Sequence, residues 1–202
     1  MTMLALFPLS QPLFPDSKFS LRVFEARYLN LIERCQSSGE PFGVVTLLEG
    51  NEVLTPGVTE KFSSVGCLAH VLEANPVEPG MLSVMCKGGQ RFNVQDAQRD
   101  VLGLWRASVE MLPEDIAVDI PPDLQSVADR LGSLIAQSQR QGFEDRLPVS
   151  RPYRLDECGW VANQWANLIN LDAVQKLEIL QEDDPLARLT MVKLLLDHTG
   201  MK

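Results

Sequence analysis

The residues best suited to metal chemistry are Cys67, His70 and Cys86, because thiolates and imidazoles are the ligands that zinc prefers. Cys67 and His70 stand three positions apart in one predicted strand, and Cys86 belongs to the next predicted strand. Residues three apart in a strand point to opposite faces of the sheet. The chain offers neither a fourth ligand nor a Cys-x-x-Cys pair. We therefore expect no metal site and interpret the cysteines as small apolar residues of the core.

General acid–base chemistry finds little support in the chain. The only two histidines are His70 and His198, so neither a Ser-His-Asp set nor a histidine base is indicated. Acidic residues occur side by side at Glu114-Asp115, at Glu144-Asp145 and at 182–184. A hydrolase needs two carboxyl groups that are held apart and have different pKa values. We interpret these acidic residues as solvated caps and loops, and we expect no catalytic residue and no cofactor.

The strongest candidate for a binding surface is formed by Arg27, Asn30 and Arg34, on the polar side of a predicted helix. Two cationic side chains in an acidic protein could attract an acidic or unfolded polypeptide. Two structural alternatives stay open. The residues could form a solvated helix face with Glu33 as an ion-pair neighbour, and Arg27 could link the helix to a barrel.

The elements around this candidate follow from the pattern of apolar residues. Alternation at Phe19, Leu21 and Val23 predicts a strand with one buried face. A helical stripe then begins at Phe24 and ends near Gly39. The stripe consists of Phe24, Tyr28, Leu31, Ile32 and Cys35. Proline lacks an N–H for sheet pairing, so the earlier pairs at 7–8 and 14–15 (both Phe-Pro) predict edges or corners.

Short apolar runs separated by turn residues predict β structure up to residue 112. The predicted strands are 42–48, 65–73, 81–87, 90–96 and 104–112. Turns are expected at Gly50-Asn51, Pro56-Gly57, Asn75-Pro76 and Pro79-Gly80, and Gly88-Gly89 is interpreted as a hairpin turn. Closure is the simplest way to remove exposed strand edges, so we expect a small closed or partly closed barrel.

The pattern changes near residue 113 and becomes helical beyond residue 122. Acidic residues and three prolines predict a linker over 113–122. Helices are predicted from about residue 124 with Asp123 as N-cap, and over 156–170, 172–181 and 185–198. Asp184-Pro185 has the form of an N-cap followed by proline. The fold class is α+β, with a β-barrel subdomain at 1–112 and a helical bundle at 123–202.

Composition excludes several function classes. The 18 basic and 27 acidic residues give a net charge of −9, which disfavours nucleic acid as a partner. No apolar run approaches the roughly 18 residues that a membrane helix needs, and the N-terminus does not resemble a signal peptide. The four cysteines stand at unrelated spacings, as expected of reduced thiols. We expect a cytoplasmic protein that binds no membrane.

The order of several motifs resembles the N-terminal substrate-recognition domain of Lon-type ATP-dependent proteases. The motifs are "LFPL", "LFP", "FSLRVFEARYLNLIERC", "FGVV" and "VGCLAHVLEANPVEPGMLSVMCKGGQRFNV", with "EDDPLARLTMVKLLLD" near the C-terminus. The resemblance implies a PUA-like pseudo-barrel of strands with one early helix, followed by a helical bundle. The chain has Ala26 where many members have proline, and Cys67 where threonine is common.

The catalytic parts of Lon proteases have no counterpart in the chain. There is no G-x-x-x-x-G-K-[ST] phosphate loop, and 202 residues leave no room for a separate serine–lysine protease domain. The resemblance therefore implies a stand-alone, non-catalytic module that recognises unfolded or partner polypeptides, and an adapter linked to ATP-dependent proteolysis is one form that this role could take. The alternatives are a small-molecule sensor or enzyme with a pocket between barrel and bundle, and an RNA-binding PUA-like module. A homodimer through strand edges is left open.

Overall fold

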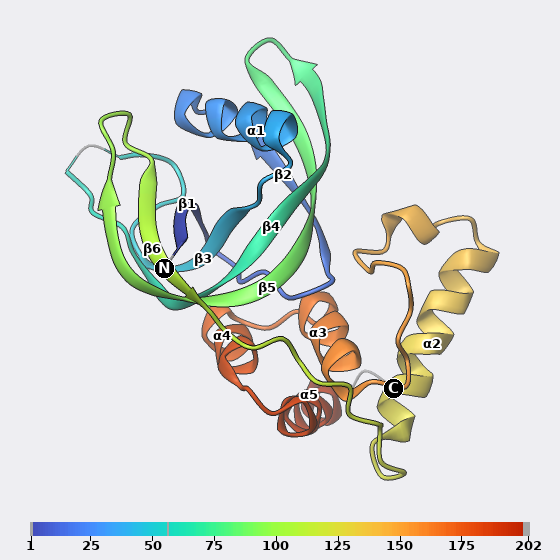
Figure 1. The fold of residues 1–202 in the computed structure, drawn as a ribbon. Helices are drawn as coiled ribbons and strands as arrows, with labels where there is room; N and C mark the ends of the chain where they lie inside the picture. Colours follow the sequence, from blue (N-terminus) through green and yellow to red (C-terminus); the bar gives the residue numbers. More distant parts are fainter. Residues whose placement is uncertain (1, 56, 200–202) are drawn as a thin grey trace. The chain divides into compact units, whose positions relative to one another are not determined.

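The computed structural model describes residues 2–55 and 57–199, and the chain divides into two compact units (Figure 1). Unit 1 is Met1–Pro113, and unit 2 is Glu114–Lys202. Unit 1 holds the strands and one helix, whereas unit 2 is built from helices and loops. The predicted α+β class, with a barrel-like unit before a helical one, is confirmed.

The strands of unit 1 form one strongly curved sheet. They are β1 (Thr2–Leu9), β2 (Lys18–Val23), β3 (Phe42–Glu49), β4 (Lys61–Glu78), β5 (Met81–Arg99) and β6 (Trp105–Met111). The strand order is β2-β5-β4-β3-β1-β6, and β5 also pairs with β6. This second pairing brings the sheet back on itself as a pseudo-barrel, as Figure 1 shows. Most of its strand edges are thereby paired, as expected for a stable small barrel.

The two Phe-Pro pairs lie where the sheet allows a missing N–H. Strand β1 pairs with β6 only from Thr2 to Leu6, and its parallel pairing with β3 runs from Leu6 to Leu9. Pro8 therefore lies beyond the β6 pairing, on a stretch with one partner strand. Pro15 lies in a turn, followed by Asp16 with a φ of 60°. Both prolines occupy the interrupted edge and the corner that the sequence predicts.

The prediction of a hairpin turn at Gly88-Gly89 is wrong, because both glycines lie inside the long strand β5. The turn between Phe14 and Ser17 packs directly against Gly88. A Cβ on Gly88 would lie 2.0 Å from the carbonyl oxygen of Phe14. The amide of Gly88 donates to Ser17 O at 2.8 Å, and the amide of Asp16 donates to Gly88 O at 2.9 Å. Glycine is required here for close backbone approach and not for a turn.

Strand β4 is likewise longer than predicted. It runs through Asn75-Pro76, where the sequence predicts a turn, and Pro76 pairs with Leu82 of β5. The other predicted turn, at Pro79-Gly80, is confirmed, and Gly80 has a φ of 79°. The β4–β5 hairpin therefore extends as a long arm with its tip at residues 79–80 (Figure 1).

Helix α1 (Ala26–Ser38) packs its apolar face on the sheet and ends at Gly39, which has a φ of 74°. Its buried residues include Tyr28, Leu31, Ile32 and Cys35 as predicted. Phe24 is the exception. It precedes the helix on extended chain and is 49% exposed, so its predicted place in the buried stripe is wrong. The helical phase begins two residues later than the apolar pattern suggests.

Unit 2 contains α2 (Gln125–Arg140), the short 3-10 helix η1 (Glu144–Arg146), α3 (Cys158–Leu168), α4 (Ala173–Gln181) and α5 (Pro185–Thr199). Asp172 caps α4 in a capping box with Gln175, and Asp184 accepts from the amide of Leu186 at the start of α5. The predicted cap at Asp123 is wrong, because Leu124 occupies the N-cap position without a side-chain hydrogen bond.

Candidate functional site

Arg27 lies at the start of α1, and its side chain is buried with 3% exposure. Its Nη1 donates to the carbonyl oxygen of Gly103 at 2.8 Å, and its Nη2 lies 3.1 Å from Glu25 Oε2. The guanidinium also stacks over the Tyr28 ring, 4.4 Å from the centroid. The prediction that Arg27 lies on the exposed face is therefore wrong. Its charge is neutralised inside unit 1, and it links the helix to the barrel.

Glu25 connects this arginine to a further segment. Its Oε2 accepts from the backbone amide of Leu54, in the loop between β3 and β4, at 3.3 Å. The Glu25–Arg27 pair thus joins the start of α1, the β3–β4 loop and the turn between β5 and β6, which contains Gly103. The bond to Leu54 is exposed and the bond to Gly103 is partly buried. The pair therefore fixes three segments that are distant in the sequence.

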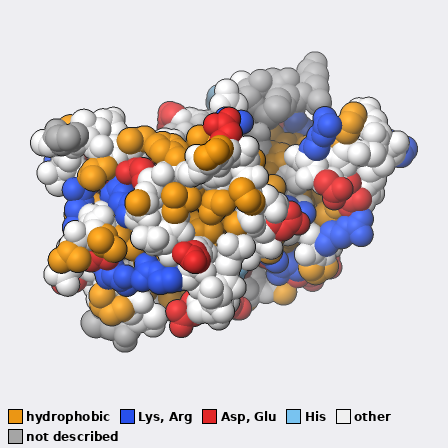
Figure 2. Space-filling view, turned by 90° about the horizontal axis from the view of Figure 1, so that it is seen from above, with side chains coloured by type: hydrophobic (Ala, Val, Ile, Leu, Met, Phe, Trp, Pro, Cys, Tyr) orange, Lys and Arg blue, Asp and Glu red, His pale blue; other side chains and the backbone are white. Residues whose placement is uncertain are grey.

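Large apolar side chains project into solvent from these three segments. We call them the three-loop patch, and they are Phe24, Val53, Leu54, Val101 and Leu102, with exposures from 44% to 102%. The side chain of Leu54 reaches within 4.0 Å of the Cβ position of Gly103, so the β3–β4 loop lies against the β5–β6 turn. In Figure 1 these two loops lie side by side at one end of the barrel. Seen from above, hydrophobic side chains are interspersed with charged ones on the surface (Figure 2).

The side chain of Tyr28 packs in the core beneath the N-terminal end of α1. Its ring stacks on that of Phe7 with 3.7 Å between the centroids. Burial raises the pKa of Tyr28 to about 12, although the cation of Arg27 acts in the opposite direction. Tyr28 therefore stays neutral at physiological pH. The three-loop patch therefore lies next to the buried ring of Tyr28 and the paired charges of Glu25 and Arg27.

Asn30 and Arg34, the other two predicted binding residues, are exposed on α1. Arg34 Nε donates to Asn30 O at 3.3 Å. Asn30 lines a groove of about 300 Å³ between α1 and the tip of the β4–β5 hairpin, which we call the α1 groove. The structure therefore separates the three predicted residues: Arg27 is internal, Asn30 lines the groove, and Arg34 is exposed on the same helix but does not line the groove. Their role in partner binding stays a prediction.

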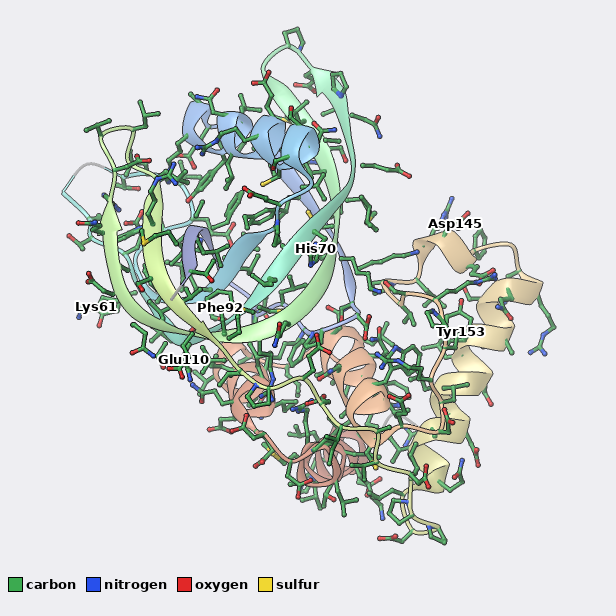
Figure 3. All side chains as sticks on the ribbon, in the orientation of Figure 1. Lys61, His70, Phe92, Glu110, Asp145 and Tyr153 are labelled. Carbon is green, nitrogen blue, oxygen red and sulfur yellow. The ribbon has the colours of Figure 1, made fainter. Side chains whose placement is uncertain are left out.

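The residues considered for zinc do not converge. Cys67 is fully buried, whereas His70 is exposed on the same strand, where Figure 3 labels it. Burial raises the pKa of the Cys67 thiol, and it raises that of Cys86 to about 12, so neither is a ready thiolate. Within residues 2–55 and 57–199, no group of three or more His, Cys, Asp or Glu could hold a metal ion.

The chain matches a known protein family. Residues 3–198 match the model of the ATP-dependent protease La (LON) substrate-binding domain. The chain belongs to this family. A crystal structure of a Lon N-terminal domain protein from Xanthomonas campestris shares 29% identity with this LON domain at a TM-score of 0.73, covering 96% of this chain and 98% of that one. The N-terminal domain of a Mycobacterium avium complex Lon protease has the same fold, with 15% identity and a TM-score of 0.65.

Two curated relatives are longer proteins. A Lon protease of Aquifex aeolicus is 23% identical over 98% of this chain, and a Lon protease of Solibacter usitatus is 28% identical over 66%. The LON domain described here spans 24% and 16% of their lengths. The resemblance inferred from the sequence motifs is thus confirmed at the level of the family.

In two of the three acidic clusters of the LON domain, one carboxylate pairs with an arginine and stays partly exposed. Asp115 binds the fully buried Arg188, whose Nη1 and Nη2 lie 2.5 and 3.0 Å from its carboxylate oxygens. Part of the predicted linker is thus bonded to α5. Glu144 accepts from Arg151, from Gln139 and from Tyr153, labelled in Figure 3. These hydrogen bonds lower the pKa of Glu144 to about 2.

Sequence reasoning missed the three-loop patch because its members are far apart in the chain. The turn "DVLGL" at 100–104 offered a usable signal, since Val101 and Leu102 are large apolar residues at a tight hairpin tip. Gly103 has a φ of 80° and Asp100 accepts from the amides of Leu102 and Leu104, which explains why this sequence makes a turn.

In the part of the chain that the structure describes, no helix is long and apolar enough to span a membrane.

Proposed function

We propose that this LON domain binds unfolded or extended polypeptides through the three-loop patch and does so without catalysis. The observation that carries the proposal is the exposure of five large apolar side chains on three segments that one ion pair fixes together. Single exposed apolar residues are normal, but a cluster on structured loops indicates an interaction surface. Apolar contacts tolerate many client sequences, which suits a domain of a substrate-binding family.

Preorganisation distinguishes this patch from scattered surface residues. Arg27 and Glu25 anchor the loops from below, so little conformational entropy is lost when a client binds. The patch members carry no charge, and a client segment exposed by unfolding is commonly apolar. The four cysteines are free and buried, which is compatible with the reducing cytoplasm that we propose as the location.

The binding proposal is tested with a fluorescently labelled, leucine-rich unfolded peptide and measured by anisotropy. Leu54→Ser with Leu102→Ser should raise Kd about ten-fold, since each leucine contributes part of its transfer free energy on burial. The matched control is Leu72→Ser with Val174→Ser, two apolar residues with 48% and 60% exposure outside the patch. Equal Kd values for the two double variants, each shown to be folded, would contradict the proposal.

We also propose that the bound polypeptide is handed to an ATP-dependent protease, as the names of the family and of its relatives suggest. A photo-crosslinking residue in place of Leu102 would test this in native lysate. Stoichiometric capture of an ATP-dependent protease supports an adapter role. Capture of many unrelated unfolded proteins without a protease contradicts that role and leaves client binding in place.

A further inference from the structure

The α1 groove differs from the three-loop patch in composition and in charge. Its walls come from α1 on one side and from the tip of the β4–β5 hairpin on the other. The residues used below are Leu29, Asn30, Glu33, Glu78, Met81 and Leu82. All belong to unit 1, so the groove is a property of this unit alone.

Two carboxylates on opposite walls give the groove a negative character. Glu33 lies on α1 and Glu78 on the hairpin, and both are exposed. In the described parts of the chain, neither carboxylate forms a hydrogen bond or an ion pair. None of the described lining residues is Lys or Arg, and Arg34, although on the same helix, is not part of the lining. Two unpaired negative charges therefore face one small space.

The orientation of α1 adds to this potential. The groove follows the helix toward its C-terminal end, where Gln36 also contributes to the lining. The last turn of α1 contains no basic residue. The C-terminal end of a helix carries a partial negative charge, which cations normally offset. Here no side chain of the last turn provides that cation.

The floor of the groove is apolar and adaptable. Leu29 and Leu82 are partly buried and pack on the barrel core, and Met81 lies next to them at the hairpin tip. Methionine adjusts its shape easily and is common at surfaces that accept varied partners. A lysine or arginine side chain combines an aliphatic stem with a cationic head, so it matches an apolar floor with an acidic rim.

We propose that the α1 groove binds a lysine or arginine side chain of the polypeptide client, with its stem on Leu82 and Met81 and its charge between Glu33 and Glu78. The Asn30 amide lies in the same groove and can hydrogen-bond the client backbone. This inference rests on the proposed function in that the ligand is a polypeptide. It adds a preference for basic residues, which is the opposite of the acidic client that Arg27 and Arg34 suggested.

The experiment uses two labelled ten-residue peptides of glycine, serine and leucine that differ only at one central position, lysine or norleucine. Norleucine keeps the stem and removes the charge. The unmodified protein should bind the lysine peptide about five-fold more tightly, the size expected of two exposed charge pairs. Glu33→Gln with Glu78→Gln should abolish this preference and leave the affinity for the norleucine peptide unchanged.

The control is Glu40→Gln with Glu73→Gln, which makes the same change in net charge at exposed glutamates of unit 1 outside the groove. This variant should keep the five-fold preference. The inference is overturned if the unmodified protein does not prefer lysine, or if both double variants lose the preference equally. Leu54→Ser with Leu102→Ser separates the two proposals. Weakened binding of both peptides with an intact lysine preference supports both, whereas unchanged binding contradicts only the patch.

Discussion

The two ends of helix α1 differ in the kind of side chain that is exposed at the surface. At the N-terminal end, Glu25 and Arg27 are paired beneath the surface while Phe24 and its neighbours in the three-loop patch are exposed. Farther along the helix, Glu33 and Gln36 line the α1 groove, and the Glu33 carboxylate stands unpaired there. One helix thus separates an apolar surface from an acidic one. The comparison shows that charged residues on a surface helix cannot be assigned to binding from their helical position alone.

The largest expected effect concerns the buried ion pair at the N-terminal end. Arg27→Met keeps the aliphatic stem but removes the guanidinium that binds Glu25 and the Gly103 carbonyl. We expect the free energy of unfolding to fall by about 2 kcal/mol, because the partly buried Glu25 carboxylate and the Gly103 carbonyl lose a charged donor. Urea unfolding measures this change. Arg34→Met is the control, since exposed substitutions change stability by no more than about 0.5 kcal/mol. Similar losses for both variants would remove the contrast.

The next prediction uses the buried tyrosine beneath the same end. The pKa of Tyr28 is raised to about 12, whereas a tyrosine of the unfolded chain titrates near about 10. The folded state holds the proton longer, so this contribution to stability is complete below about pH 10 and is lost between about pH 10 and pH 12. Unfolding in urea at several alkaline pH values should show the decline.

Tyr28→Phe should make the decline between about pH 10 and pH 12 shallower, because phenylalanine has no proton to lose, and the buried thiols of Cys67 and Cys86 account for the decline that remains. Tyr153→Phe is the comparison at the other tyrosine of the chain. Partial burial and the hydrogen bond to Glu144 raise the pKa of Tyr153 as well, but this side chain is less buried than Tyr28, so we expect the smaller change in the decline. An unchanged pH dependence in Tyr28→Phe would show that Tyr28 is not held neutral by burial.

The smallest effect is the response of the two surfaces to salt. Raising sodium chloride from about 50 to about 500 mM screens exposed charges, so the lysine preference of the α1 groove should fall from about five-fold to less than two-fold. Binding of the norleucine peptide to the three-loop patch should change by less than about two-fold, because it depends on apolar contacts. Isothermal calorimetry at both salt concentrations checks this. A parallel loss for both peptides would mean that one charged surface binds both.

Local patterns in the sequence were sufficient for most elements of the fold. Alternation predicted β2, the helical stripe predicted α1 with its end at Gly39, and Asp184-Pro185 marked the start of α5. The order of motifs predicted the family. These features depend on neighbours within a few residues, which is the range over which periodicity and capping act.

The features that were missed depend on contacts between distant residues. Arg27 is buried because it bonds to Gly103, which lies 76 positions later. Position 88, inside a strand, is glycine because the carbonyl oxygen of Phe14 lies where a Cβ would be. The candidate site was therefore only partly predictable: the helix was correct and Asn30 reaches a groove, but the apolar patch assembles from three loops that share no sequence pattern.

The most direct test of the contrast is a methyl NMR titration of the full chain with an uncharged leucine-rich peptide and then with the lysine peptide. We expect the uncharged peptide to shift the methyl resonances of Leu54, Val101 and Leu102. The lysine peptide should additionally shift those of Leu82 and Met81 in the α1 groove. Shifts confined to residues outside both surfaces, such as Leu72 or Leu194, would contradict the account.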